Sequence, residues 1–149
     1  MEKLHLAGEE IRHITTGKED FMPLLLEADP SEAMIRRYLD DGEMYLLSVH
    51  GKPACVAVVK DGELMNLATA PELRGQGCAT RLMNHVFERM APRYRRLRVG
   101  TSPANVPFYE RLGFVRDGLR KNFFTDNYPE PIIEDGQVLT DMIMMSKTL

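Results

Sequence analysis

The sequence predicts a mixed α/β fold in which an antiparallel meander leads into a strand–helix–strand crossover. Three apolar runs follow one another at 44–49, 54–59 and 64–70, separated by turn residues. A glycine-bearing turn and a long amphipathic helix come next, and the chain then returns in a fourth run at 95–99. Parallel strands joined through a helix make a right-handed crossover. Hairpins and a crossover together predict one mixed sheet.

Two short helices are predicted before the meander. Residues 16–19 have the Thr-x-x-Glu form of a capping box, which indicates a helix start. Asp29-Pro30 is a second start signal, with an acidic N-cap and a proline in the first turn. Leu4 and Leu6 alternate with polar neighbours and predict a short first strand; the segment around 11–14 has no assignment. The second helix has an apolar stripe, which comprises Met34, Ile35, Tyr38 and Leu39.

The links in the meander carry hairpin residues. Asp61-Gly62 between the second and third runs is typical of a two-residue hairpin turn, because both residues tolerate positive φ. His50-Gly51 occupies the preceding link. The third run therefore enters the glycine turn from an antiparallel partner.

The turn at 74–80 is the centre of the sequence. Gly75 and Gly77 flank Gln76, and the helix that follows has apolar residues at helical spacing before Pro92 stops it. The first N–H groups of a helix have no partner within it and lie at the positive end of its dipole. A strand feeding such a turn favours a phosphate site, to which Arg74 can add a charged contact. The helix stripe comprises Ala79, Leu82, Met83, Val86, Phe87 and Met90.

The residue sequence of the turn differs from the common nucleotide-binding motifs. The GxxxxGK[ST] loop is absent, and GxGxxG fails because Thr80 stands where the third glycine is needed. The run Arg74-Gly75-Gln76-Gly77-Cys78-Ala79 resembles the Q/R-x-x-G-x-G/A motif of the GCN5-related N-acetyltransferases (GNAT). The preceding residues 67–72, LATAPE, resemble the strand that leads into it.

A second motif lies further along the chain. Residues 108–114, FYERLGF, resemble the F/LYExLGF segment of the same family, with Gly113 as the C-cap of a short helix. A strand opening at 114–115 and a last strand at 138–145 complete the family's element order. The resemblance covers essentially the whole chain and implies a GNAT-like fold in which the strands at 64–70 and 95–99 splay apart.

The resemblance also implies where acetyl-CoA binds. Its pantetheine arm would pair with the backbone of the strand before the turn, its pyrophosphate would lie on the turn, and further contacts would come from the short helix. Tyr109 would lie near the sulfur as the catalytic residue. Either Ser102 or Asn105 occupies the place of a pantetheine-contacting Asn, and Asn105 is equally a helix cap. Phe108 is a candidate for both cofactor contact and core. The cofactor-binding candidates are Leu67, Ala68, Thr69, Arg74, Gly75, Gln76, Gly77, Cys78, Ala79, Thr80, Asn105, Phe108 and Tyr109.

The chemistry implied is direct attack of a primary amine on the thioester in a ternary complex. A carboxylate can take the proton of the amine, and the Tyr109 phenol can donate to the leaving thiolate. Glu63 and Asp61 are candidate bases, although the hairpin position favours solvated surface charge. Glu134 and Asp135 are candidates for meeting a cationic substrate, or ordinary surface charge.

Composition limits the alternatives. At 149 residues the chain predicts one domain, 1–149, and a net charge of −3 disfavours nucleic acid and anionic membranes as partners. Cys55 and Cys78 have no metal-binding spacing, so no metal is expected, and they suit a reducing cytoplasm. Cys78 in the turn is expected to have a somewhat acidic thiol, yet a small buried residue is the favoured interpretation. The sequence has no apolar segment long enough to predict a membrane span.

Two other functions stay open from the sequence. A CoA-binding or partner-binding module of the same fold without turnover would bind CoA and release no thiol. A protein that uses the turn for ATP or NAD is disfavoured by the two missing motifs. A homodimer is also admitted by the resemblance, and no face is indicated for it.

Overall fold

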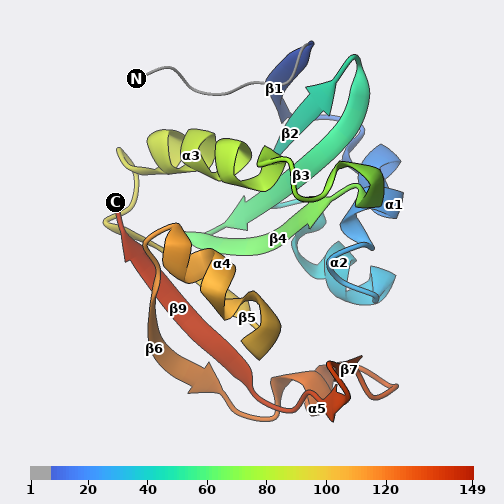
Figure 1. Cartoon of the computed structure of the whole chain (residues 1–149), viewed down its shortest axis with the longest axis vertical. Helices are drawn as coiled ribbons and strands as arrows, with labels where there is room; N and C mark the ends of the chain where they lie inside the picture. Colours follow the sequence, from blue (N-terminus) through green and yellow to red (C-terminus); the bar gives the residue numbers. More distant parts are fainter. Residues whose placement is uncertain (1–7) are drawn as a thin grey trace. The chain divides into compact units, whose positions relative to one another are not determined.

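The computed structural model of the chain describes residues 8–149 (Figure 1). The chain divides into two compact units. The first unit extends to Asp61 and includes Met65–Arg89; the second comprises Gly62–Leu64 and Met90–Leu149. The single domain expected from chain length stays a prediction.

The first unit contains the meander. Strand β2 (Glu43–Val49) pairs antiparallel with β1 (Glu9–Ile14) on one side and with β3 (Lys52–Lys60) on the other. Strand β4 (Glu63–Thr69) follows β3 after a turn in which Asp61 and Gly62 have φ of 51° and 76°. Both values are positive, as the hairpin prediction requires.

The helices of the first unit cover both faces of its strands. Helices α1 (Met22–Leu25) and α2 (Glu32–Leu39) share a buried cluster with alternate residues of β2 and β3, and all four residues of the predicted α2 stripe are buried. Successive side chains of a strand point to opposite faces. On β2, Tyr45 lies on the face opposite the cluster and contacts the ring of His85 on α3 (Cys78–Met90) at 5.7 Å. Thus α3 covers the other face.

A buried amide ties β4 to the two short helices. Asn66 is 4% exposed, and its Nδ2 donates to the Leu25 carbonyl oxygen at 3.1 Å and to the Tyr38 hydroxyl at 3.0 Å. Buried polar groups normally have such partners. These bonds hold the carboxyl end of α1 beside the middle of β4.

The second unit contains the remaining strands. Strand β9 (Met142–Thr148) pairs antiparallel with β5 (Arg96–Thr101) and with β6 (Val115–Arg120). Strand β5 also pairs parallel with the start of β4, which confirms the predicted crossover. The hydrogen-bonding order of the seven strands is β1-β2-β3-β4-β5-β9-β6, so the sheet is mixed as predicted. Short elements complete the unit: helix α4 (Val106–Arg111), helix α5 (Phe123–Asn127), and strands β7 (Ile133–Glu134) and β8 (Gln137–Val138).

Several predicted boundaries change. Leu4 and Leu6 lie outside the described residues, and the unassigned segment around 11–14 belongs to β1. The prediction of a capping box at 16–19 is wrong, because no side chain caps the helix there. A 3₁₀ turn begins at Lys18, after Gly17 in the left-handed region. The last strand begins at Met142, four residues after the start that the apolar pattern indicates.

The N-cap of the second helix lies two residues after the predicted cap. Ser31 caps α2 by accepting from the Met34 N–H at 3.2 Å. Asp29, the predicted cap, accepts from the Ser31 N–H at 3.1 Å. The acid therefore orders the residue that performs the capping.

Candidate functional site

The turn before α3 has the backbone of an anion site. After β4 the chain makes a short 3₁₀ turn (η2, Pro71–Leu73) and reaches Gly75 and Gly77 with φ of 76° and 79°. The Arg81 N–H bonds the Gly77 carbonyl at 3.0 Å. Because each helical bond spans four residues, the N–H groups of Cys78–Thr80 precede this bond. These donors lie at the positive end of a 13-residue helix.

The predicted turn residues are arranged around this backbone. Gly75, Gln76, Gly77 and Thr80 are exposed, and Ala79 is half-buried. A Cβ at Gly75 would meet nothing within 4 Å, so the outer side of the turn is open. These positions are open to a ligand in the way a phosphate site requires.

The thiol of Cys78 is less acidic than its place at a helix N-terminus suggests. Its side chain is 1% exposed, and burial raises the pKa of its thiol despite the nearby Arg81 charge. The acidic thiol expected from the helix N-terminus is therefore wrong, because desolvation disfavours the thiolate more than the local charge favours it. Cys78 fits the favoured interpretation, a small buried residue of the turn.

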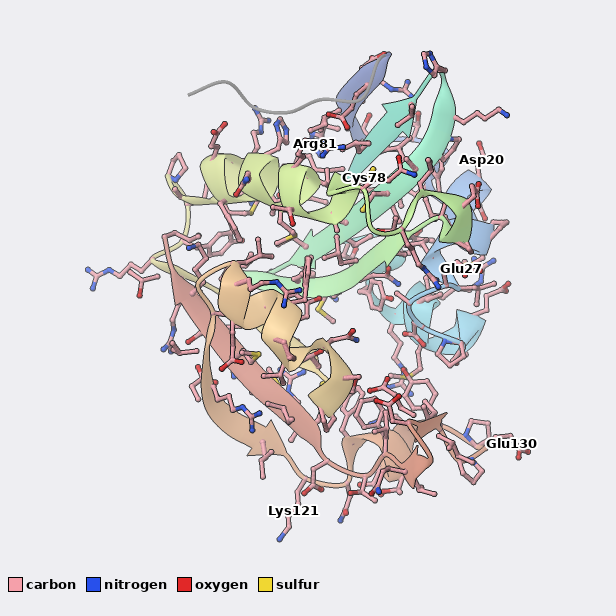
Figure 2. All side chains as sticks on the ribbon, viewed as in Figure 1. Asp20, Glu27, Cys78, Arg81, Lys121 and Glu130 are labelled. Atoms are coloured by element: carbon pink, nitrogen blue, oxygen red, sulfur yellow. The ribbon has the colours of Figure 1, made fainter. Side chains whose placement is uncertain are left out.

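Arg74 is held in an exposed ion pair. Its Nη2 lies 3.1 Å from Oε1 of Glu27, which follows α1 in the chain, and the side chains are 56% and 39% exposed. Figure 2 shows Glu27 beside α1. The basic group predicted for the phosphate therefore has an acidic partner 47 residues away in the sequence.

A second arginine of the turn was missed by the sequence reasoning. Arg81, in the first turn of α3 (Figure 2), donates from Nε and Nη2 to the carboxylate of Glu9 on β1, with distances of 2.7 to 3.0 Å. Its Nη1 donates to the Gln76 carbonyl at 2.9 Å. The Gln76 contact is local and spans five residues, whereas the Glu9 contact spans 72 and has no local signal.

The strand before the turn carries the other predicted cofactor residues of the first unit. Leu67 and Thr69 are half-buried and Ala68 is buried. Thr69 Oγ1 donates to Cys55 Sγ at 3.4 Å, and burial raises the pKa of the Cys55 thiol to about 12. In the part of the chain that the structure describes, the parallel ladder of β4 with β5 covers Glu63 and Leu64 and ends before Leu67.

The second unit holds the predicted catalytic tyrosine. Tyr109 on α4 is 8% exposed and lies between the rings of Phe108 and Phe114, with centroids at 5.1 and 5.4 Å. The Phe114 N–H bonds the Tyr109 carbonyl at 3.0 Å, and Gly113 has φ of 99°, which confirms the C-cap. Asn105 is exposed at the start of α4, and its side chain does not cap the helix.

The candidate carboxylates have structural contacts. Glu63 forms a two-bond ion pair with Arg120, at 2.7 and 2.9 Å, and its side chain is 15% exposed. Asp61 is exposed in the hairpin turn. Glu134 accepts from the Ala104 N–H at 3.3 Å. Both oxygens of the Glu63 carboxylate are thus engaged by Arg120, and Glu134 is engaged by a backbone N–H.

The structure gathers the turn, Arg74, Arg81 and the β4 residues in the first unit, and Asn105, Phe108 and Tyr109 in the second. Among residues 8–149, no group of three or more His, Cys, Asp or Glu side chains is placed to hold a metal ion. In the same residues, no helix has the length and apolar character needed to cross a bilayer.

Sequence comparison decides the family. The family model described as acetyltransferase (GNAT) domain matches residues 15–127. The chain belongs to the GNAT acetyltransferase family. It is an acyl-CoA-dependent acetyltransferase, and its co-substrate is acetyl-CoA. The resemblance drawn from the two motifs is confirmed.

Relatives cover nearly the full length of the chain. A GNAT family acetyltransferase from Elizabethkingia anophelis, solved with acetyl-CoA bound, is 36% identical, with a TM-score of 0.89 over 95% of this chain and 99% of that one. An IAA acetyltransferase from Bacillus cereus is 32% identical, with a TM-score of 0.87 and the same coverage. The uncharacterized N-acetyltransferase YvbK of Bacillus subtilis (strain 168) is 27% identical over 97% of this chain and 96% of its own. The expected GNAT-like fold is thereby confirmed.

Proposed function

We propose that this GNAT acetyltransferase transfers the acetyl group of acetyl-CoA to a primary amine by direct attack within a ternary complex. The observation that carries the proposal is the open turn, with Gly75 and Gly77 at positive φ ahead of the donors of α3. A relative that shares the fold was solved with acetyl-CoA bound, which supports acetyl-CoA as the ligand in this proposal.

In this proposal the first unit binds the cofactor. The N–H groups from Gly75 to Thr80 hold the pyrophosphate, since donors at a helix N-terminus favour an anion, whereas the Arg74 N–H already bonds the Pro71 carbonyl at 3.4 Å. The backbone of Leu67, Ala68 and Thr69 pairs with the pantetheine arm, as the family resemblance implies. Contacts from Asn105 and Phe108 complete the predicted set.

The second unit supplies the acid. The amine nitrogen forms a bond to the thioester carbon while the carbon–sulfur bond breaks, and the electron pair of that bond stays on sulfur. Nitrogen loses one proton and sulfur gains one, so no covalent enzyme intermediate is needed. Tyr109 is the proposed donor to sulfur, because a phenol with an ordinary pKa of about 10 is protonated at neutral pH. Holding both reactants in one complex supplies much of the rate enhancement.

Calorimetric titration with acetyl-CoA, CoA, ATP and NAD tests the cofactor assignment. Binding of only the two CoA species is the expected result. Thiol release from acetyl-CoA is then followed with a panel of an alkylamine, an aromatic amine, free amino acids and a peptide with a free N-terminus. Acetyl-CoA binding without amine-dependent thiol release across the panel would refute the proposed amine acceptor.

A further inference from the structure

Arg81 uses its whole guanidinium group to connect two distant parts of the first unit. Nε and Nη2 face the carboxylate of Glu9, and Nη1 faces the carbonyl oxygen of Gln76 at 2.9 Å. The planar fork of arginine donors fits such a two-bond contact with a carboxylate and leaves the other nitrogen for a third acceptor. One side chain therefore links β1 to the middle of the glycine turn.

The surroundings of this pair determine its role. The Glu9 side chain is 3% exposed and that of Arg81 is 14% exposed. Hydrogen bonding to Glu9 raises the pKa of Arg81, so the guanidinium stays charged. Because a buried carboxylate already balances that charge, Arg81 serves the turn as a fixed hydrogen-bond donor more than as a phosphate-binding cation.

The Gln76 contact controls a neighbouring donor. A peptide group is planar and trans, so the Gln76 C=O and the Gly77 N–H lie in one plane and point in opposite directions. Glycines on both sides of Gln76 would otherwise leave this plane free to rotate. With the carbonyl held by Arg81, the Gly77 N–H points away from Arg81.

We propose that Arg81, held by Glu9, is a positioning residue that aims the Gly77 N–H at the pyrophosphate of acetyl-CoA. This assignment rests on the proposed placement of the cofactor on the turn. A contribution from β1 to cofactor affinity follows, although β1 has no motif residue.

The test compares acetyl-CoA affinity with stability. Arg81→Met removes both contacts and leaves the Glu9 carboxylate buried without its arginine, so affinity and melting temperature both fall. The expected loss of acetyl-CoA affinity by calorimetry is about 10- to 100-fold, the size of a hydrogen bond from a charged group. With the amine of the thiol-release screen, KM for acetyl-CoA rises by a similar factor while kcat changes by less than about 2-fold.

The double variant Glu9→Gln/Arg81→Met separates positioning from stability. It removes the buried charge, so the melting temperature recovers toward the parent. The Gln76 carbonyl is still unsupported, so affinity stays low. Arg81→Lys gives an intermediate loss, because one ammonium cannot reproduce the fork. Arg36→Met is the charge-matched control, since Arg36 pairs on α2 with Glu32 at 3.1 Å; it leaves acetyl-CoA affinity unchanged.

The outcomes are distinct. Affinity within about 2-fold of the parent in Arg81→Met, or affinity that recovers together with melting temperature in the double variant, overturns the positioning role. If Arg81→Met does not fold, the double variant and Arg81→Lys decide the question on the same readouts. Failure of the parent itself to bind acetyl-CoA overturns both this role and the placement of the cofactor on the turn.

Discussion

The ion pair between Arg74 and Glu27 makes a signed prediction for cofactor affinity. If Arg74 contacts the pyrophosphate, Glu27 competes for it in the unbound protein. Replacing Glu27 by Gln keeps the shape of the side chain and removes the competing charge. We expect acetyl-CoA to bind Glu27→Gln more tightly than the parent.

The magnitude follows from the exposure of the pair. The two side chains are 56% and 39% exposed at 3.1 Å. Exposed ion pairs contribute about 0.2–1 kcal/mol, because water and salt screen them. The gain in affinity is therefore about 1.4- to 5-fold at low salt. Arg74→Gln, in contrast, loses a charge-assisted contact to phosphate and weakens binding by about 10-fold or more.

Calorimetry at two salt concentrations measures both effects. The gain in Glu27→Gln should fade as salt rises, because screening already weakens the pair in the parent. In the double variant the affinity should match that of Arg74→Gln, since Glu27 then has no arginine to withhold. Glu32→Gln is the matched control: it removes the same charge from an ion pair of the first unit that does not involve Arg74.

Two results would refute this reasoning. If Arg74→Gln binds acetyl-CoA like the parent, Arg74 does not contact the cofactor. If Glu32→Gln gains as much affinity as Glu27→Gln, the effect is one of net charge and the pair has no specific role.

Three further predictions can be tested. Gly77→Asp places a carboxylate at a φ of 79° beside the pyrophosphate, so calorimetry should show an affinity loss of about 100-fold or more, whereas Gly51→Asp, in an open hairpin, should show none. Tyr109→Phe should lower kcat by about 100-fold with acetyl-CoA affinity retained; unchanged turnover across pH would exclude it as the acid. The Cys55 thiol, whose pKa is raised from 9.0 to about 12, should resist alkylation at pH 8 until the protein unfolds; rapid labelling of the native protein would contradict this. The contribution of this thiol to the free energy of unfolding should be complete below pH 9 and should decline as the pH rises toward 12.

The meander and α3 were predictable because their signals are local. Asp61-Gly62 specifies a turn within a few residues, and the α3 stripe repeats at helical spacing, with Leu82, Met83, Val86 and Met90 all fully buried. The same turn rule also applies to Asp135-Gly136, with φ of 51° and 75° between β7 and β8, a hairpin that the sequence analysis does not predict. There the signal was present and the flanking strands, of two residues each, were too short to show alternation.

Strand β1 was not predictable from its own residues. Its sequence, EEIRHI, is mostly polar, and Ile14 is its only buried apolar residue. Its pairing partner β2 supplies the register, from Glu9 opposite Val49 to Ile14 opposite Met44. An edge strand has a partner on one side and can face solvent, so the hydrophobic pattern used to find strands is weak there.

The features of the candidate site likewise fall into those that the local sequence specifies and those that depend on distant partners. The open turn depends on two glycines and a helix start, all of which the local sequence specifies. The partners of its charged residues depend on tertiary contacts: Arg74 reaches Glu27 and Arg81 reaches Glu9, across 47 and 72 residues. No spacing rule connects residues so far apart. Sequence reasoning therefore predicted an anion site at this turn and missed the tertiary partners of its two arginines.

These contacts assign different roles to the two arginines of the turn. The Arg74 pair is exposed, so a phosphate can replace its carboxylate partner at small cost. The Arg81 pair is largely buried, and separating it would leave Glu9 without compensation, so it is expected to persist when ligand binds. We therefore expect Arg74 to be the exchangeable cation of the turn and Arg81 its fixed support. Equal losses of affinity and stability in both arginine variants would contradict this division.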